Sequence, residues 1–147
     1  MKGLSLVEEY QAVIKDLGQV PALAAQIEQC AAEAGSPAEK QMDIRLCASE
    51  ALYNALIHGN GLDAAKSVRV SWRASHGELW LTVADEGQGV PLDLRHPQVL
   101  EEAALFCESG KGIYLINQLA QAVTFNERGN EITMRLTWSG SGKCERK

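Results

Sequence analysis

The sequence is poor in aromatic residues, has no long apolar run and carries no excess of positive charge. Aromatic side chains make up 5% of its 147 residues, and no apolar stretch approaches the roughly 20 residues that span a membrane. The first residues also lack the basic, apolar and small-residue order of a signal peptide. We therefore expect a cytoplasmic protein without a membrane segment. The net charge of −5 argues against a binder of phosphate backbones, which concentrates Lys and Arg to displace counterions, so we expect no direct nucleic-acid partner.

Cysteine is also scarce, and its four residues show neither CxxC spacing nor a histidine at metal-ligand spacing. This pattern argues against a disulfide framework or a zinc site and predicts reduced thiols at Cys30, Cys47, Cys107 and Cys144. The length suits one domain with a real core. We expect a single domain over residues 1–138 and a flexible tail over residues 139–147, whose sequence is SGSGKCERK.

The spacing of the apolar residues predicts both helices and strands. A first helix is predicted from Val20 to Ala34, stopped by Gly35, and a second from Ser36 to about His58. A short third helix is predicted over residues 112–120. Alternating apolar and polar residues predict an opening strand and two hairpins, over residues 4–14, 67–74 with 78–85, and 122–127 with 131–138. The predicted fold class is α+β, a two-layer sandwich of a mixed, mostly antiparallel sheet with helices on one face.

The second predicted helix carries two polar residues at positions where apolar residues are expected. On a helical wheel, Glu50 and Asn54 lie between an apolar edge made by Leu46 and Ile57 and a packed stripe of small and apolar residues. A carboxylate and an amide held out of bulk water cost several kcal/mol unless they are paired or face a ligand. One turn apart, they rise about 6 Å along one face, close enough to serve one metal-bound substrate. A hydrogen-bonded structural pair is the alternative that this spacing leaves open. The stripe comprises Ile44, Cys47, Ala48, Ala51 and Ala55.

The stretch DEGQGV follows an apolar strand directly and begins at Asp85. Gly87 and Gly89 permit positive φ angles and let a flat ligand approach the backbone. The Asp85 carboxylate can only accept hydrogen bonds, so it would match a donor such as the exocyclic amine of adenine. An ordinary hairpin turn is the alternative explanation.

The stretch SGKGIYLI places Gly110, Lys111 and Gly112 where a helix is predicted to begin. Free N–H groups at a helix start, together with a lysine, form a cradle for an anion. The stretch does not match the P-loop pattern, because Leu105 stands at the first glycine position and no Ser or Thr follows the lysine. A flexible hinge entering the helix is the alternative.

Taken in order along the chain, these features resemble the GHKL family of ATPases, over about residues 40 to 137. Within that family the sequence is most similar to bacterial anti-sigma-factor serine/threonine kinases, in its size, in its NAxxHGN form and in GKGIYLI before a closing hairpin. The segments that resemble the family's N box, first glycine box and second glycine box are Glu50-Ala-Leu-Tyr-Asn54-Ala-Leu-Ile-His58, Asp85-Glu-Gly87-Gln-Gly89 and Gly110-Lys111-Gly112-Ile.

The resemblance implies a site for ATP and Mg²⁺. Glu50 would be the general base, and Asn54 would bind Mg²⁺ through its carbonyl oxygen. Asp85 would contact adenine, while the long segment over residues 90–109 would be a lid that closes over ATP and excludes water. His58 would cap the helix or contact the site residues. The phosphates would be held by Gly110, Lys111 and Gly112, beside a floor formed by Gly87 and Gly89.

The resemblance also implies partners. Such kinases phosphorylate a STAS-domain anti-sigma antagonist, alternatively sequester a sigma factor, and usually form homodimers. Two other functions stay open, a non-catalytic ATP-gated binding module and the catalytic domain of a split histidine kinase. The stretch GNEITM replaces the family's usual GT pair, which leaves open whether Glu131 or Thr133 approaches adenine.

Overall fold

A five-stranded antiparallel sheet forms one layer of the molecule. The computed structural model of the protein describes residues 8–95 and 108–138, and within them the strands follow the order β2-β3-β4-β6-β5. All four pairings are antiparallel, so the described sheet is not mixed. The strands are β2 (Glu9–Ile14), β3 (Val68–Ser75), β4 (Glu78–Ala84), β5 (Ala122–Phe125) and β6 (Glu131–Thr137).

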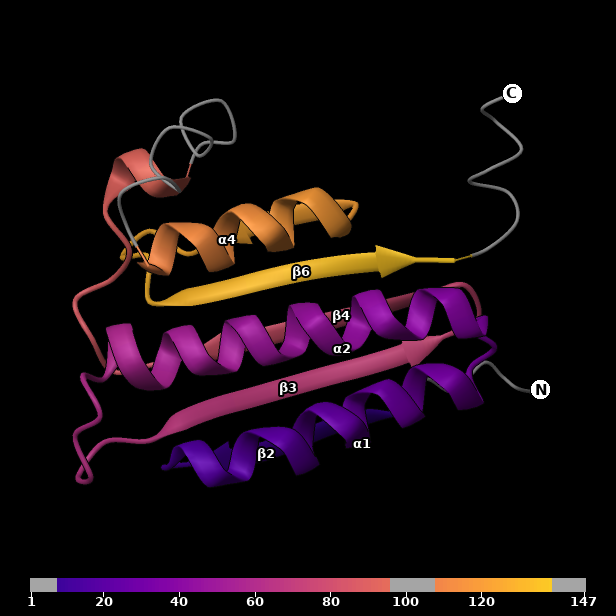
Figure 1. The fold of residues 1–147 in the computed structure, drawn as a ribbon, viewed down its shortest axis with the longest axis horizontal. Helices are drawn as coiled ribbons and strands as arrows, with labels where there is room; N and C mark the ends of the chain where they lie inside the picture. The colour runs from indigo at the N-terminus through magenta and orange to yellow at the C-terminus, as the bar shows by residue number, and fades with distance from the viewer. Residues whose placement is uncertain (1–7, 96–107, 139–147) are drawn as a thin grey trace.

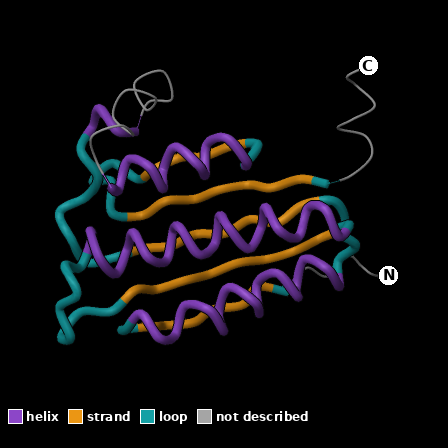
Figure 2. The backbone as a smooth tube through the Cα atoms, in the orientation of Figure 1, coloured by secondary structure: helices purple, strands orange, loops and turns teal. Residues whose placement is uncertain are grey.

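Helices cover one face of this sheet and form the second layer (Figure 1). Figure 2 shows the three long helices running side by side over the strands. They are α1 (Val20–Glu33), α2 (Ala38–Tyr53) and α4 (Glu108–Leu119). Three shorter helical segments complete the described elements: η1 (Leu17–Gln19), the π-helix η2 (Asn54–Gly59) and η3 (Leu92–Arg95). The predicted α+β sandwich with helices on one face is confirmed.

The first helix begins and ends where the sequence predicts. Pro21 lies in its first turn, where the missing N–H removes no helical hydrogen bond. Gly35, with φ of 104°, ends the helix in the left-handed conformation that glycine adopts without steric cost. The chain then turns into α2, whose N-cap is Pro37.

The second helix buries the stripe that the wheel predicts. Ile44, Cys47, Ala48, Ala51 and Ala55 are at most 4% exposed and belong to the core between the two layers. Leu46 and Ile57, however, are 39% and 37% exposed, so the second apolar edge faces outward instead of packing. The last turn, expected to be α-helical up to His58, is the π-helix η2.

The sheet presents alternate residues to the core and to its uncovered face. Toward the helices, Trp72, Leu81 and Met134 are at most 2% exposed. On the other face, β3, β4 and β6 place Arg73, Trp80 and Arg135 side by side in register. Both guanidinium groups lie about 6 Å from the Trp80 ring, at 5.7 and 5.8 Å. On this face the two guanidinium groups thus lie over the Trp80 ring.

One predicted boundary is wrong. The third long helix was expected at residue 112 but begins at Glu108, four residues earlier. The described part of the predicted lid, residues 90–95, contains η3, and Leu94 of that segment is 5% exposed. The structure confirms a strand over Glu9–Ile14. The first part of the predicted strand, the lid residues 96–107 and the tail 139–147 lie outside the described residues.

Cys30 and Cys47 are free thiols, the first half-buried and the second buried, as expected of reduced cysteines. Burial raises the pKa of Cys47 to about 12, which keeps this thiol protonated and unreactive. Cys107 and Cys144 lie outside the described residues. None of the described helices is both long and apolar enough to cross a lipid bilayer.

Candidate nucleotide-binding site

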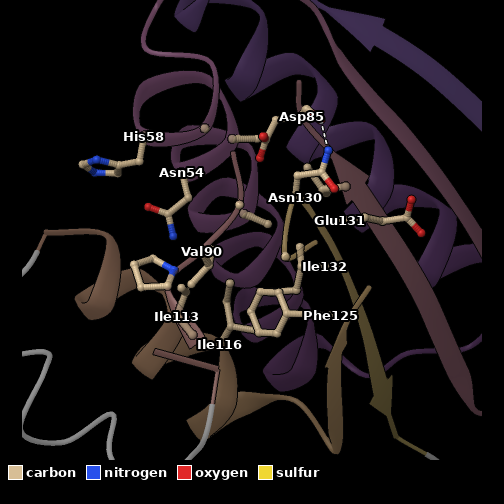
Figure 3. A pocket seen from close by; sticks show the side chains of 17 residues that line it. Asn54, His58, Asp85, Val90, Ile113, Ile116, Phe125, Asn130, Glu131 and Ile132 are labelled. Carbon is tan, nitrogen blue, oxygen red and sulfur yellow. Dashed lines mark hydrogen bonds between the residues drawn. The ribbon is translucent and has the colours of Figure 1, made fainter. Parts of the chain in front are cut away.

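A cavity of about 180 Å³ lies at the end of the sandwich where α2 passes into η2. It opens between the helices and the ends of β4 and β6 (Figure 3). Its apolar wall includes Val83, Val90, Ile113, Ile116, Phe125 and Ile132, and its polar wall includes Asn54, His58, Asp85 and Asn130. Apolar walls with a few polar groups are typical of a small-molecule site. The volume is below the roughly 300 Å³ of the smallest drug-sized pockets, so the cavity can hold only part of a nucleotide.

Glu50 of α2 and Asn54, the first residue of η2, both point at the same place on α4. A β-carbon at Gly112 would come within 2.8 Å of both Glu50 Oε1 and Asn54 Nδ2. Both side chains are half-buried, as the wheel predicts. Asn54 lines the cavity and Glu50 does not, so the Glu50 carboxylate lies outside the cavity, one helical turn before Asn54 in the sequence.

Asp85 stands at the end of β4 with its carboxylate held from two sides. The Gly87 N–H donates to Asp85 Oδ1 at 2.7 Å. The Gly59 Cα lies so close that a β-carbon there would overlap the Asp85 carboxyl group. Burial raises the pKa of Asp85 above its usual value, and the bond from Gly87 lowers it less than burial raises it. A carboxylate has a second oxygen with which to accept a donor from a ligand.

A buried asparagine fixes the turn that follows Asp85. Asn60 is 4% exposed, its Oδ1 accepts the Glu86 N–H at 2.7 Å, and its Nδ2 donates to the Ser67 carbonyl at 3.0 Å. The Ser67 N–H in turn donates to the Glu86 carboxylate at 2.8 Å. Because the end of the α2–η2 helix carries Asn60, these bonds join it to the turn and hold both parts of the site in one position.

Asn130 is a polar residue of the cavity that the sequence analysis missed. Its Nδ2 donates to the Asp85 carbonyl at 2.9 Å, drawn as a dashed line in Figure 3. The Asp85 N–H donates back to the Asn130 carbonyl at 2.8 Å. The only local signal for this role is that Asn130 follows Gly129 directly at the start of the last strand.

Glu131 and Thr133 are the two other residues that were candidates for contact with adenine. Thr133 lies on the uncovered face of the sheet, where its hydroxyl is 3.0 Å from that of Thr82. Glu131 reaches the cavity wall, but Figure 3 shows its carboxylate directed away from the Phe125 ring and Ile132. Neither residue therefore turns a polar side chain into the cavity.

The glycine-rich segment over residues 110–112 lies inside α4 and not at its start. Only the first four N–H groups of a helix lack partners within it, and α4 begins at Glu108. Gly112 therefore lies in the second turn, and its N–H is not among the free ones. Gly110 is buried in the first turn, and the Lys111 side chain is exposed. Gly112 instead allows α4 to approach Glu50 and Asn54.

The other predicted glycines lie beside the cavity. Gly89 lines it and has φ of 102°, which favours glycine. Gly87 is buried, and a β-carbon there would overlap the Gly59 carbonyl. His58 is exposed at the cavity rim. The predicted residues thus gather at one end of the sandwich, although Glu50, Gly87, Gly110, Lys111 and Gly112 do not line the cavity itself.

The cavity suits a planar base that carries an amine. One carboxylate faces an otherwise largely apolar space, where the Phe125 ring provides flat contact area and Ile113 adds apolar contact area. A polar group buried among such walls must be hydrogen-bonded, which the carboxylate would achieve with an exocyclic amine. Asn54 stands between this space and Glu50, and a neutral amide oxygen is a ligand that Mg²⁺ accepts. The residues present therefore fit ATP and its metal ion.

An antiparallel sheet with one helical layer, and a cavity at the end of that layer, form an architecture that suits a nucleotide-binding domain. The sequence matches the family model of the histidine kinase-like ATPase domain over residues 13–136. The chain belongs to this family, and its membership implies ATP binding. No curated protein matches the chain closely enough to count as a relative.

Proposed function

We propose that this protein is an ATP-dependent serine/threonine kinase that acts as an anti-sigma factor. It would phosphorylate a STAS-domain antagonist and, in the alternative state, sequester a sigma factor as a homodimer in the cytoplasm. The observation that carries the catalytic part is that Glu50 and Asn54 meet at Gly112, one turn beyond the cavity that contains Asp85. The choice of partners rests on the resemblance of the N box and of GKGIYLI to those kinases.

In this proposal each residue has one task. Asp85 would accept a hydrogen bond from the base, and Asn54 would hold Mg²⁺ through its amide oxygen. The metal ion, when bound, supplies positive charge beside the phosphates. Glu50 takes the proton of the acceptor hydroxyl while the hydroxyl oxygen bonds to the γ-phosphorus, and the bond from that phosphorus to the bridging oxygen breaks to release ADP.

The test is transfer of labelled γ-phosphate to a STAS-domain protein. Glu50→Gln should abolish transfer and largely spare ATP binding, because the isosteric amide cannot accept the proton. Glu39→Gln is the matched control, since Glu39 is exposed in the first turn of the same helix. Unchanged regulation of a sigma factor by Glu50→Gln would favour a non-catalytic ATP-gated module. Transfer to a histidine would favour a split histidine kinase.

The metal ion has a test of its own. ATP affinity measured by calorimetry should fall when Mg²⁺ is chelated. Asn54→Ala should weaken binding in Mg²⁺ and remove this dependence, because the variant has no amide oxygen to offer. Binding that depends equally on Mg²⁺ in the variant and the wild type would show that Asn54 is not the ligand.

A further inference from the structure

Arg95, the last residue of η3, binds three main-chain carbonyls on two separate loops. Its Nε donates to the Val90 carbonyl at 2.9 Å. Its two terminal nitrogens donate to the Glu127 carbonyl at 3.0 Å and the Arg128 carbonyl at 2.9 Å. The first acceptor lies five residues away in sequence, and the other two lie 32 and 33 residues away. One side chain therefore joins the turn after β4 to the turn between β5 and β6.

The two loops also fit closely against each other beneath this guanidinium. The Val90 N–H donates to the Gly129 carbonyl at 2.9 Å. A β-carbon at Gly89 would overlap the Arg128 carbonyl, and one at Gly129 would overlap the Arg95 guanidinium. Both glycines have positive φ angles. Any other residue at either position would therefore strain the backbone in addition to overlapping its neighbour.

These loops are walls of the nucleotide cavity. The first contributes Gly89, Val90 and Pro91 to its lining, and the second contributes Gly129 and Asn130. Asn130 is the residue whose amide holds the Asp85 carbonyl. Displacement of either loop would therefore move the Asp85 carboxylate, which faces the base. Arg95 does not line the cavity, so it acts on the site through other residues.

The residue before Arg95 anchors η3 to the opposite wall. Leu94 packs against Ile113 of α4 in a small apolar cluster that also includes Val90 and Phe125. Three of these contacts, Ile113, Val90 and Phe125, line the cavity. The short helix is thus held by an apolar contact on one side and by the guanidinium on the other.

We propose that Arg95 is a positioning residue for nucleotide binding, which preorganises the two loops that form the base end of the cavity. The assignment rests on the proposed binding of ATP at this cavity. A guanidinium suits the task because its donors form a fixed planar fork, whereas an ammonium group is a point charge on a flexible stem. Preorganised walls raise affinity by removing the ordering cost from the binding step.

The experiment compares Arg95→Ala, Arg95→Lys and the wild type for binding of ATP and of ADP by calorimetry. Arg135→Ala is the matched control, because Arg135 also forms a 2.7 Å charged hydrogen bond, to Glu78, but on the uncovered face of the sheet. We expect Arg95→Ala to weaken both nucleotides equally, by about tenfold, which corresponds to about 1.4 kcal/mol. The nucleotide affinity of Arg95→Lys should lie between those of the wild type and Arg95→Ala, and Arg135→Ala should bind both nucleotides as the wild type does. Millimolar guanidinium should restore binding to Arg95→Ala and leave Arg95→Lys unchanged.

The possible results separate this assignment from the proposed function. Wild-type protein that binds no ATP would overturn both. Wild-type binding together with undiminished binding by Arg95→Ala, or by Arg95→Lys if the alanine variant does not fold, would overturn the assignment alone. A larger loss for ATP than for ADP would also overturn it, because that result would mean a direct contact with the terminal phosphate.

Discussion

Replacement of Gly112 by alanine should damage catalysis without damaging the fold. The new β-carbon would lie 2.8 Å from Glu50 Oε1 and from Asn54 Nδ2, whereas unstrained contacts between such atoms begin near 3.5 Å. Each side chain must therefore move by about 0.7 Å. Both atoms are the ends of side chains that can rotate, so the movement costs the fold little. It nevertheless displaces the proposed base and metal ligand together.

The expected magnitude follows from that displacement. A shift of about 1 Å in a reacting group can reduce the rate about 100-fold, so we expect a loss of ATP turnover between about 10-fold and 100-fold. Alanine is favoured over glycine inside a helix by about 0.5–1 kcal/mol, which offsets the cost of moving the side chains. The melting temperature should stay within about 4 °C of the wild type.

The assay combines ADP release, with and without a protein acceptor, and thermal unfolding. Gly18→Ala is the control for the same substitution elsewhere, because its β-carbon would meet only Asp16 Oδ1, at 3.4 Å. A double-mutant cycle with Glu50→Gln isolates the cause, since Gly112→Ala should add little once the base is gone. Wild-type turnover by a stable Gly112→Ala protein would refute the reasoning. A large drop in melting temperature would refute it as well.

Substitutions at three further residues test other parts of the structure. Asp85→Asn should weaken ATP binding, measured by calorimetry, by about 10-fold to 100-fold through loss of a charged acceptor. Burial raises the pKa of Asp85, so the contribution of this residue to stability is lost as pH rises through that pKa. At neutral pH the Asp85→Asn protein should therefore unfold at no lower temperature than the wild type. Lowering the pH through the same raised pKa should weaken ATP binding by the wild type, and pH-independent affinity would contradict that role. Gly89→Ala should destabilise the fold by about 1–3 kcal/mol in urea unfolding, because it combines a positive φ with an overlap on the Arg128 carbonyl. Trp72→Phe should cost less than about 1.5 kcal/mol in the same assay, since the buried Trp72 Nε1 has no hydrogen-bond partner among residues 8–95 and 108–138, whereas Trp72→Ala should cost about 3–5 kcal/mol.

Local periodicity was sufficient to predict the helices, the hairpins and the face of α2 that packs, and the two-layer arrangement is what the family resemblance implies. The buried stripe from Ile44 to Ala55 repeats at helical spacing, and the β3–β4 hairpin alternates at period two around Gly77. Such patterns are visible in sequence because each residue's environment depends on its neighbours in the same element. The convergence of Glu50 and Asn54 was predictable for the same reason.

Features that depend on distant segments were not predictable. The start of α4 was placed too late because Gly110 and Gly112 have low helix propensity, whereas the close approach of α2 requires glycine at residue 112. The role of Arg95 depends on carbonyls more than 30 residues away, which leave no mark on the local sequence. Asn130 likewise acquires its partner only when β6 pairs with β4.

The π-helix η2 contains a surplus residue relative to an α-helix, because each of its hydrogen bonds skips one residue more. Deletion of a single residue between Asn54 and Gly59 would restore ordinary helical bonding and rotate everything that follows by about 100°. Gly59 would then leave the Asp85 carboxyl group, and Asn60 would lose the Glu86 N–H. The length of η2 thus fixes how the Asp85 turn is rotated relative to the helix that bears Glu50. A shorter η2 would make the domain more compact, but Glu50 and Asp85 would no longer face one site.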